Sequence, residues 1–228
     1  MHLLIPSPAP RAYVVRRGWT MLTWWILGCA LRGGAAHEVD LADLAPLAPE
    51  GLEELRDEEH GLAVARTLLA GARVEQDRAA ARVDVARERR RQVELERNVE
   101  KARLDAAEAS ADESLRGLAL GRYEEARRAV DTAEAGERWQ IAAADTAKEE
   151  TRLAEARVNL RETELEMARL ELLARYDQGR GYMRSEFVEQ LRDAQRKYDE
   201  AQRRYDQASE KSMRAYERWR ALDERVQG

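Results

Sequence analysis

Residues 187–226 read FVEQLRDAQRKYDEAQRRYDQASEKSMRAYERWRALDERV. A strand would show a period of two and an isolated helix a period of about 3.6, whereas a period of about 3.5 is typical of a helix that supercoils against another helix. The stretch has this third period, because apolar or small residues recur at alternating intervals of four and three. It therefore predicts a coiled-coil helix whose packing seam contains Phe187, Leu191, Ala194, Tyr198, Ala201, Tyr205, Ala208, Ser212, Ala215, Trp219, Leu222 and Val226.

The rest of the chain favours long helices of the same kind. Charged residues make up 36% of the sequence and aromatic residues 6%, so apolar content lies mainly in alanine, leucine and valine on charged helices. The five prolines all lie at or before Pro49, which leaves the remaining chain free of the strongest helix breaker. Long helices are therefore expected from about residue 51 onward.

Two pairs of glycines divide this helical region. Gly117 and Gly121 form one pair and Gly179 and Gly181 the other, and glycine commonly ends a helix in a left-handed turn. The expected helices span residues 62–116, 123–176 and 184–227. Because short connections fold consecutive helices back on each other, the sequence predicts an all-α fold, a long antiparallel helical hairpin extended to a three-helix coiled-coil bundle.

The expected second helix is apolar on two sides. One side contains Leu153, Ala156, Leu160, Thr163, Met167, Leu170 and Ala174, and the other contains Val158, Leu165, Ala168, Leu172 and Tyr176. A helix with two apolar sides packs against two neighbours, so this helix is expected at the centre of the bundle.

The expected first helix also carries two seams. One contains Leu62, Ala65, Leu69, Ala72, Ala79, Val83 and Ala86, and the other contains Val74, Ala81, Val85, Leu95, Val99, Ala102, Ala106 and Ala109. The two overlap, and packing is expected to pass from one to the other near residues 87–92. This predicts a second partner for the first helix, either the third helix or another copy of the chain.

Residues 1–36 have the layout of a secretory signal peptide. Arg11, Arg16 and Arg17 precede an uncharged run over residues 18–31, and small residues follow it up to Ala36. The run of 14 residues is shorter than the ~20 that a membrane-spanning helix needs. The segment therefore predicts export to the periplasm or envelope.

Cys29 is the only cysteine and the lipidation candidate. It ends the run Ile26-Leu27-Gly28-Cys29, which resembles a bacterial lipobox, although Leu27 is larger than that motif prefers. The resemblance implies an acylated cysteine that would anchor the chain to a membrane. The alternative is signal cleavage after Ala36.

Residues 37–61 are interpreted as a tether with a short helix, because the run Ala45-Pro46-Leu47-Ala48-Pro49 is extended by its prolines.

A local resemblance concerns residues 121–133. Gly121-Arg122-Tyr123-Glu124-Glu125-Ala126 followed by Ala133 looks like the turn and second helix of a tetratricopeptide repeat, but the preceding stretch departs from that repeat and no second copy occurs at 34 residues. Together with the lipobox, the alanine-rich hairpin of residues 25–175 is similar to small helical lipoproteins of bacterial envelopes. This resemblance implies an envelope location rather than an activity.

Catalytic, metal and nucleic-acid sites are not expected. The three histidines, His2, His37 and His60, all precede the expected bundle, and carboxylates such as Glu166 lie among arginines on helix faces where solvation or ion pairing explains them. We therefore expect no cofactor and no metal.

Nucleic-acid binding is not expected either. Without residues 1–32 the chain has 35 basic against 44 acidic residues, which disfavours phosphate binding. The basic cluster Arg87, Arg89, Arg90 and Arg91 is flanked by glutamates and is interpreted as a salt-bridged face.

The functional hypothesis is a non-enzymatic, exported coiled-coil lipoprotein that acts as a spacer, scaffold or assembly partner in a bacterial envelope. Its partners would be proteins joined by helix packing, including a second copy of the chain, and a membrane if Cys29 is acylated. One alternative is a periplasmic holdase resembling the prefoldin-like envelope chaperones. Another is a helical-repeat peptide-binding module, which a groove between helices would favour.

Overall fold

The computed structural model describes residues 37–47, 49–110 and 112–227, and side chains up to residue 225. Five helices follow one another in this part of the chain: α1 Leu41–Leu44, α2 Pro49–Glu53, α3 Arg56–Ala109, α4 Glu113–Arg175 and α5 Arg184–Gln227. No strand occurs in the described ranges. The all-α prediction is confirmed.

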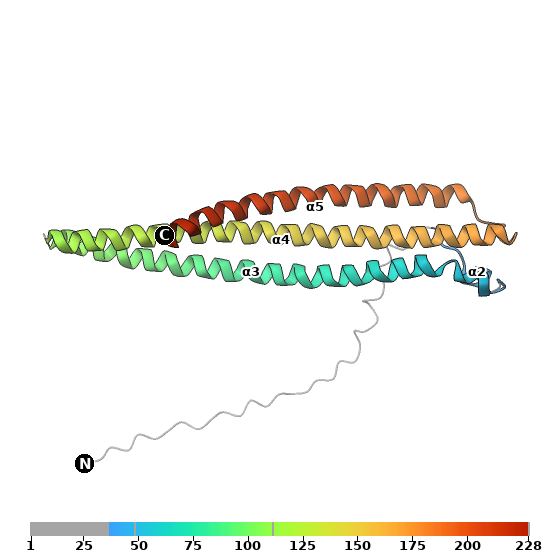
Figure 1. Cartoon of the computed structure of the whole chain (residues 1–228), viewed down its shortest axis with the longest axis horizontal. Coiled ribbons are helices and arrows are strands. Elements are labelled where there is room, and N and C mark those ends of the chain that lie inside the picture. The colour runs from blue at the N-terminus through green and yellow to red at the C-terminus, as the bar shows by residue number, and fades with distance from the viewer. Residues whose placement is uncertain (1–36, 48, 111, 228) are drawn as a thin grey trace, which may run out of the picture. The chain divides into compact units, whose positions relative to one another are not determined.

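The three long helices run up, down and up, and α4 lies between the other two (Figure 1). It packs against α3 on one side and against α5 on the other. The central position predicted from its two apolar sides is therefore confirmed. At about 1.5 Å per residue, the 54 residues of α3 and the 63 residues of α4 correspond to lengths of about 80 and 95 Å.

The first turn of the bundle lies earlier in the chain than predicted. Helix α3 ends at Ala109, and the Asp112 side chain caps the start of α4 by accepting hydrogen bonds from the backbone N–H groups of Ser114 and Leu115 at 3.0 and 3.2 Å. Gly117 and Gly121 lie within the continuous helix α4. The break expected there is wrong, because a side-chain cap and not a glycine sets this boundary. The tetratricopeptide-like turn at residues 121–133 is likewise absent, since these residues are helical throughout.

The second turn lies where the second glycine pair predicted it, but Asp177 makes the left-handed step. Its φ is +57°, its N–H donates to Ala174 O at 3.3 Å, and the next N–H, of Gln178, donates to Leu173 O at 2.9 Å. This pair of bonds is a Schellman motif, which satisfies the last carbonyls of a helix. Gly181 also has positive φ, at +115°, before α5 begins.

One face of α3 contacts α4 along its whole length. A continuous set of buried or half-buried positions keeps intervals of three and four throughout and contains Leu62, Ala65, Leu69, Ala72, Gln76, Ala79, Val83, Ala86, Arg90, Val93, Arg97, Glu100, Leu104 and Ala107. The expectation that packing passes to the second seam near residues 87–92 is therefore wrong. The first seam continues through Arg90, Arg97 and Glu100, since long polar side chains can cover an interface with their aliphatic stems.

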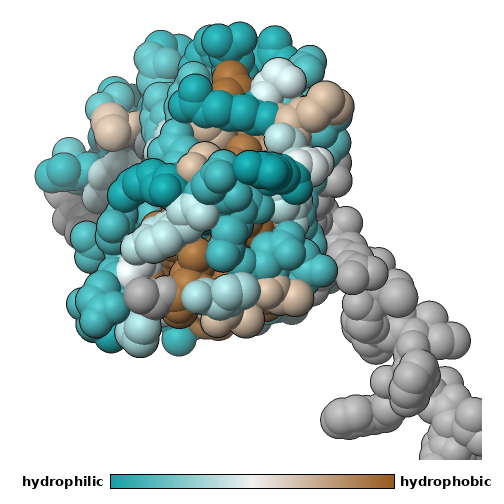
Figure 2. Space-filling view, turned by 90° about the vertical axis from the view of Figure 1, so that its right-hand side faces the viewer, coloured by the Kyte–Doolittle hydropathy of each residue, from teal (hydrophilic) through white to brown (hydrophobic). Residues whose placement is uncertain are grey.

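The apolar core of the bundle is concentrated at the end that contains the α4–α5 turn. This proximal core consists of Val39, Leu44, Leu47, Leu55, Leu62, Leu165, Leu170, Leu172, Leu173 and Phe187. Four of its ten members precede α3, so the described residues of the N-terminal segment are packed against the helices. The interpretation of residues 37–61 as a tether is therefore wrong for this segment. Figure 2 faces this end of the bundle and shows apolar surface between polar side chains.

Polar contacts fix the same segment to α4 and to the turn that follows. The Glu166 carboxylate is 7% exposed, accepts from the backbone N–H of Val39 at 2.8 Å, and pairs with Arg169 at 2.7 Å. Of the two explanations expected from sequence, ion pairing on the helix holds for Glu166 and solvation does not, because the residue is a buried anchor. The Tyr182 hydroxyl accepts from the Asp40 N–H at 2.9 Å and donates to the Asp43 carboxylate at 2.6 Å, which raises the pKa of the tyrosine.

The predicted signal peptide, Cys29 and the alternative cleavage site after Ala36 lie outside the described residues. Within the described part of the chain, no helix combines the length and apolarity needed to cross a membrane.

Candidate functional site

The seam of α5 lies along α4. Phe187 and Ala194 are buried, and the other seam positions from Leu191 to Leu222 are half-buried. The side chain of Val226 lies outside the described residues. Tyr198 shows how the seam is placed, because its hydroxyl accepts from Arg157 Nη2 of α4 at 3.2 Å and the guanidinium carbon lies 5.8 Å from its ring centroid. The tyrosine thus keeps a polar partner while its ring packs between the helices.

An aromatic cluster joins the far end of α5 to α4. The rings of Trp139 and Trp219 are stacked, with centroids 4.7 Å apart and planes 16° apart. Tyr216 lies 5.1 Å from Trp139 and 5.7 Å from Trp219. Trp219 was in the predicted seam, but Trp139 was not singled out from the sequence. Its signal was a lone tryptophan on an otherwise alanine-rich helix, at a position that only the pairing register of α4 and α5 brings opposite Trp219.

Gly136 allows the indole of Trp219 to lie against the backbone of α4. A Cβ atom at this position would lie 3.2 Å from Trp219 Nε1 and 3.3 Å from its Cδ1. These contacts are tighter than ordinary van der Waals contact, so the glycine here permits close approach of a large ring to a helix.

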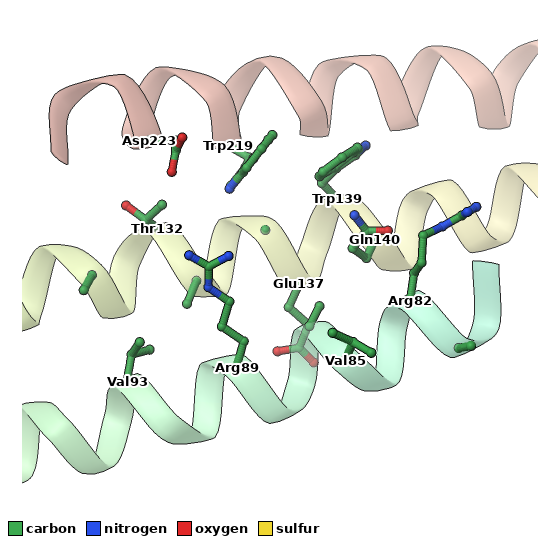
Figure 3. Close-up of a pocket in the computed structure, with 15 residues that line it drawn as sticks. Arg82, Val85, Arg89, Val93, Thr132, Glu137, Trp139, Gln140, Trp219 and Asp223 are labelled. Atoms are coloured by element: carbon green, nitrogen blue, oxygen red, sulfur yellow. The ribbon is translucent and has the colours of Figure 1, made fainter. Parts of the chain in front are cut away.

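Beside this cluster, the three long helices line an apolar groove of about 430 Å³ (Figure 3). Helix α3 contributes Val85 and Val93, α4 contributes Ala133 and Trp139, and α5 contributes Trp219. Thr132 also lines the groove, is 9% exposed, and its hydroxyl has no hydrogen-bond partner among the described residues. The groove therefore has aromatic and aliphatic walls, which suit an apolar ligand.

The basic cluster of α3 serves helix pairing at the edge of this groove. Arg90 Nη1 and Arg87 Nε lie 3.1 and 3.6 Å from the carboxylate of Glu137 on α4, whose side chain is only 12% exposed. Arg91 pairs with Glu88 on its own helix at 3.5 Å. The interpretation as a salt-bridged face is confirmed for these three arginines. Arg89 lines the groove.

The second seam of α3 is exposed. We define the outer face of α3 as Val74, Arg78, Ala81, Val85, Glu88, Gln92, Leu95, Val99, Ala102, Ala106 and Ala109, all of which are exposed. Val85 and Leu95 are 71% and 66% exposed, which is unusual for large apolar side chains that recur at heptad spacing. Ala81 and Val85 belong both to this face and to the groove wall. The groove and the outer face are therefore one continuous surface.

The ionisable groups of the described residues make no metal centre. No group of three or more His, Cys, Asp or Glu side chains lies close enough to hold an ion within these ranges. His37 instead contacts the start of α5, with Nδ1 3.3 Å from Glu186 Oε2 and its ring centroid 6.0 Å from that of Phe187. On α3, a hydrogen bond from Arg82 lowers the pKa of Glu75. These contacts explain the charged groups as parts of helix packing.

Comparisons with protein-family models, curated proteins and solved structures gave no match to this chain. The helices, the groove and the outer face of α3 are therefore the features from which a function is inferred.

Proposed function

We propose that this chain is a non-enzymatic scaffold or spacer of a bacterial cell envelope, exported and held on a membrane by acylation of Cys29. Its action is mechanical: a stiff helical hairpin is presented at a distance from the membrane and joins protein partners by helix packing. The N-terminal signal layout supports export, and the lipobox-like run supports the anchor.

The observation that carries the spacer role is the uninterrupted pairing of α3 with α4. The contact face of α3 holds its heptad phase from Leu62 to Ala107, and α4 extends past it to Arg175. Two helices joined along such a length resist bending far better than one. The hairpin tip, where α3 ends and α4 begins, is therefore held about 90 Å from the proximal core.

The experiment measures the height of the hairpin tip above a membrane. In lipid-anchored chains, a fluorophore is attached through Asp57→Cys beside the proximal core or through Leu118→Cys near the tip, and the bilayer carries acceptor lipids. We expect strong energy transfer from position 57 and little from position 118. Equal transfer from the two positions would contradict a spacer that stands away from the bilayer.

The anchor is tested separately by intact mass. Chains recovered from the membrane fraction are expected to begin at Cys29 with a diacylglyceryl group, and Cys29→Ser is expected to leave that fraction. A mature N-terminus after Ala36 would contradict the anchor.

The groove supports a second candidate function, the binding of a peptide. A groove of about 430 Å³ lined by Trp139, Trp219 and Thr132 is the specific observation in its favour. Tryptophan fluorescence should then change on titration with apolar peptides, and Trp219→Ala should abolish the response. Leu115→Ala, at an exposed site on the same bundle, is the matched control.

The hairpin tip supports the third candidate, a holdase. Leu115, Leu118 and Leu120 are exposed on the first turns of α4, as expected of arms that hold unfolded proteins. The replacement of all three by serine should then abolish protection in a client-aggregation assay. The spacer function should not be affected by this replacement.

A further inference from the structure

The outer face of α3 is a complete coiled-coil surface without a partner helix among the described residues. In heptad notation Val85 and Val99 are a positions, and Ala81, Leu95 and Ala102 are d positions. The a and d positions from 74 to 109 span five heptads, about the length at which such seams sustain pairing. The surface is therefore long enough to hold a second helix.

Most of this face is turned away from α4, and only its edge at Ala81 and Val85 borders the groove. Its residues lie about 150° around α3 from the residues that contact α4. Every a and d position from 74 to 109 is exposed, as are all five of the flanking g positions. A helix laid on this face would thus meet mainly α3, would border the groove at Ala81 and Val85, and would displace nothing in the described structure.

We propose that the occupant is α3 of a second copy of this chain, aligned parallel and in register. Charge complementarity between the two α3 helices supports this occupant. In a parallel coiled coil each g residue faces the e residue five positions later on the other helix, and these pairs set partner and orientation. Three of the g–e pairs here join opposite charges, and they are Asp77 with Arg82, Asp84 with Arg89, and Arg91 with Glu96. Twofold symmetry makes each pair occur twice.

The remaining parallel pairs carry no repulsion. Asn98 would face Arg103, and Asp105 would face Ser110, so both pairs join a charged group to a neutral polar one. None of the five g–e pairs joins like charges, whereas in the seam itself Arg78 at an a position and Glu88 at a d position would each face its own copy. Because like charges across such an interface are destabilising, a partner-free surface would have no reason to avoid them at all five g–e pairs.

An antiparallel arrangement lacks this complementarity. There g residues face g residues, and full overlap of the face places Arg91 opposite its own copy and Asp77 opposite Asp105. These contacts join like charges in three places per dimer, and among the e residues, which also face one another, Arg89 would meet its own copy while Arg82 would meet Glu96. The charge pattern therefore selects the parallel orientation.

The polar residues within the face are consistent with a two-stranded coiled coil in which the two α3 helices have a fixed register. Gln92 occupies an a position, where two facing amides can hydrogen-bond and a buried polar residue specifies register at a cost in stability. Glu88 occupies a d position and would face its own copy, which is a local cost. Arg91 already lies 3.5 Å from Glu88 on the same helix and offsets that charge.

This inference rests on the proposed assembly role and identifies the partner in that assembly as a second copy of the chain. In the resulting dimer the order of helices is α4, α3, α3 and α4, with the two α5 helices outermost. Two grooves would then open on either side of the paired α3 helices, because Ala81 and Val85 belong to both surfaces.

Disulfide trapping tests the register in the full chain. In a Cys29→Ser background, Val85→Cys and Val99→Cys are made one at a time and oxidised. Both are expected to give covalent dimers in high yield, because a positions of a parallel in-register pair face their own copies within disulfide range. In an antiparallel dimer a residue meets its own copy only at the midpoint of the overlap. Such a dimer would therefore trap at most one of the two sites. Lys101→Cys, exposed on another side of α3, is the control and should not trap.

Charge exchange tests the pairing itself by sedimentation equilibrium. Asp84→Arg places a like charge opposite Arg89 twice per dimer and should weaken dimerisation about tenfold at low salt. Arg89→Asp should do the same, and the double exchange should restore most of the affinity. Recovery in the double variant is specific to a g–e contact, since a folding defect would accumulate instead.

Three results would overturn the inference: a monomer at all concentrations tested, a dimer that traps at neither or only one of the two sites, or trapping only to a different protein. Oligomeric state is read on purified protein without reference to export or height above a membrane. A monomeric chain that is lipidated and holds its tip far from the bilayer would thus refute the pairing and leave the spacer role standing.

Discussion

The two ends of the bundle are built from the same kind of helix and differ in what stabilises them. At the proximal end, the segment before α3 joins α4 and α5 around a core in which Leu173 is fully buried. At the hairpin tip only α3 and α4 meet, and Leu118 is 67% exposed. Heptad periodicity is present in both places, so the seam by itself does not determine how much apolar surface leaves water.

This difference indicates how the molecule divides its tasks. Burial of apolar side chains is the main stabilising term, and it is concentrated where three segments of the chain meet. The tip is held by two-helix packing, by ion pairs on the helix surfaces and by one N-cap. We therefore expect the proximal end to set global stability and the tip to open locally at lower free energy.

The largest effect is expected from truncation in the proximal core. Leu173→Ala should lower the free energy of unfolding by about 3 kcal/mol, through lost burial and the cavity left behind. The matched change at the tip, Leu118→Ala, should cost less than about 0.5 kcal/mol because that side chain is already solvated. Urea denaturation of both variants measures the contrast. Similar losses would show that the two ends are not distinct.

The next effect concerns ion pairs, which also differ along the bundle. Glu166→Gln removes the charge that faces Arg169, and both side chains are largely buried, so we expect a loss of about 2 kcal/mol. Glu155→Gln breaks the pair with Arg73, in which both side chains are about half exposed, and should cost less than about 0.5 kcal/mol. Thermal unfolding of the two variants compares them. An equal shift in Tm would contradict the claim that the buried Glu166–Arg169 pair stabilises the fold more than the exposed Glu155–Arg73 pair.

A smaller effect is expected at the far end of α5. In a double-mutant cycle, Trp139→Ala and Trp219→Ala should couple by about 1 kcal/mol, because their rings stack at 4.7 Å. Leu222→Ala, on the same helix one turn after Trp219, supplies the control cycle with Trp139. Coupling of the same size in both cycles would mean that the aromatic stack adds nothing beyond general helix packing.

Periodicity predicted most of the fold because the a and d seams report directly which face of a helix is covered. It predicted the α5 helix, the central place of α4 and the contact face of early α3. It did not predict that Arg90, Arg97 and Glu100 continue that face, because charged side chains give no apolar signal although their aliphatic stems can pack, and Arg90 finds its partner Glu137 only across the helix interface. It also assigned the first turn to glycines, where the cap at Asp112 decides.

The packed N-terminal segment and the groove were beyond reach of sequence for a different reason. Val39, Leu44 and Leu47 have no regular spacing, and their burial depends on the surface that α4 and α5 create together. Glu166 differs from its neighbouring carboxylates only through the Val39 amide that meets it. Trp139 and Gly136 matter only because the pairing register brings Trp219 opposite them.

The smallest effect concerns the cap of the tip. A hydrogen bond from the Ser114 hydroxyl, followed by those from the backbone N–H groups of Leu115 and Ser114, lowers the pKa of Asp112 in the folded chain. Its stabilising contribution is therefore complete above the unfolded-state pKa and is lost as the pH falls through the folded-state pKa. The amide resonances of Ser114 and Leu115 should shift over that acidic window. Asp112→Asn accepts the same bonds without titrating, so an identical shift in that variant would contradict the assignment to Asp112.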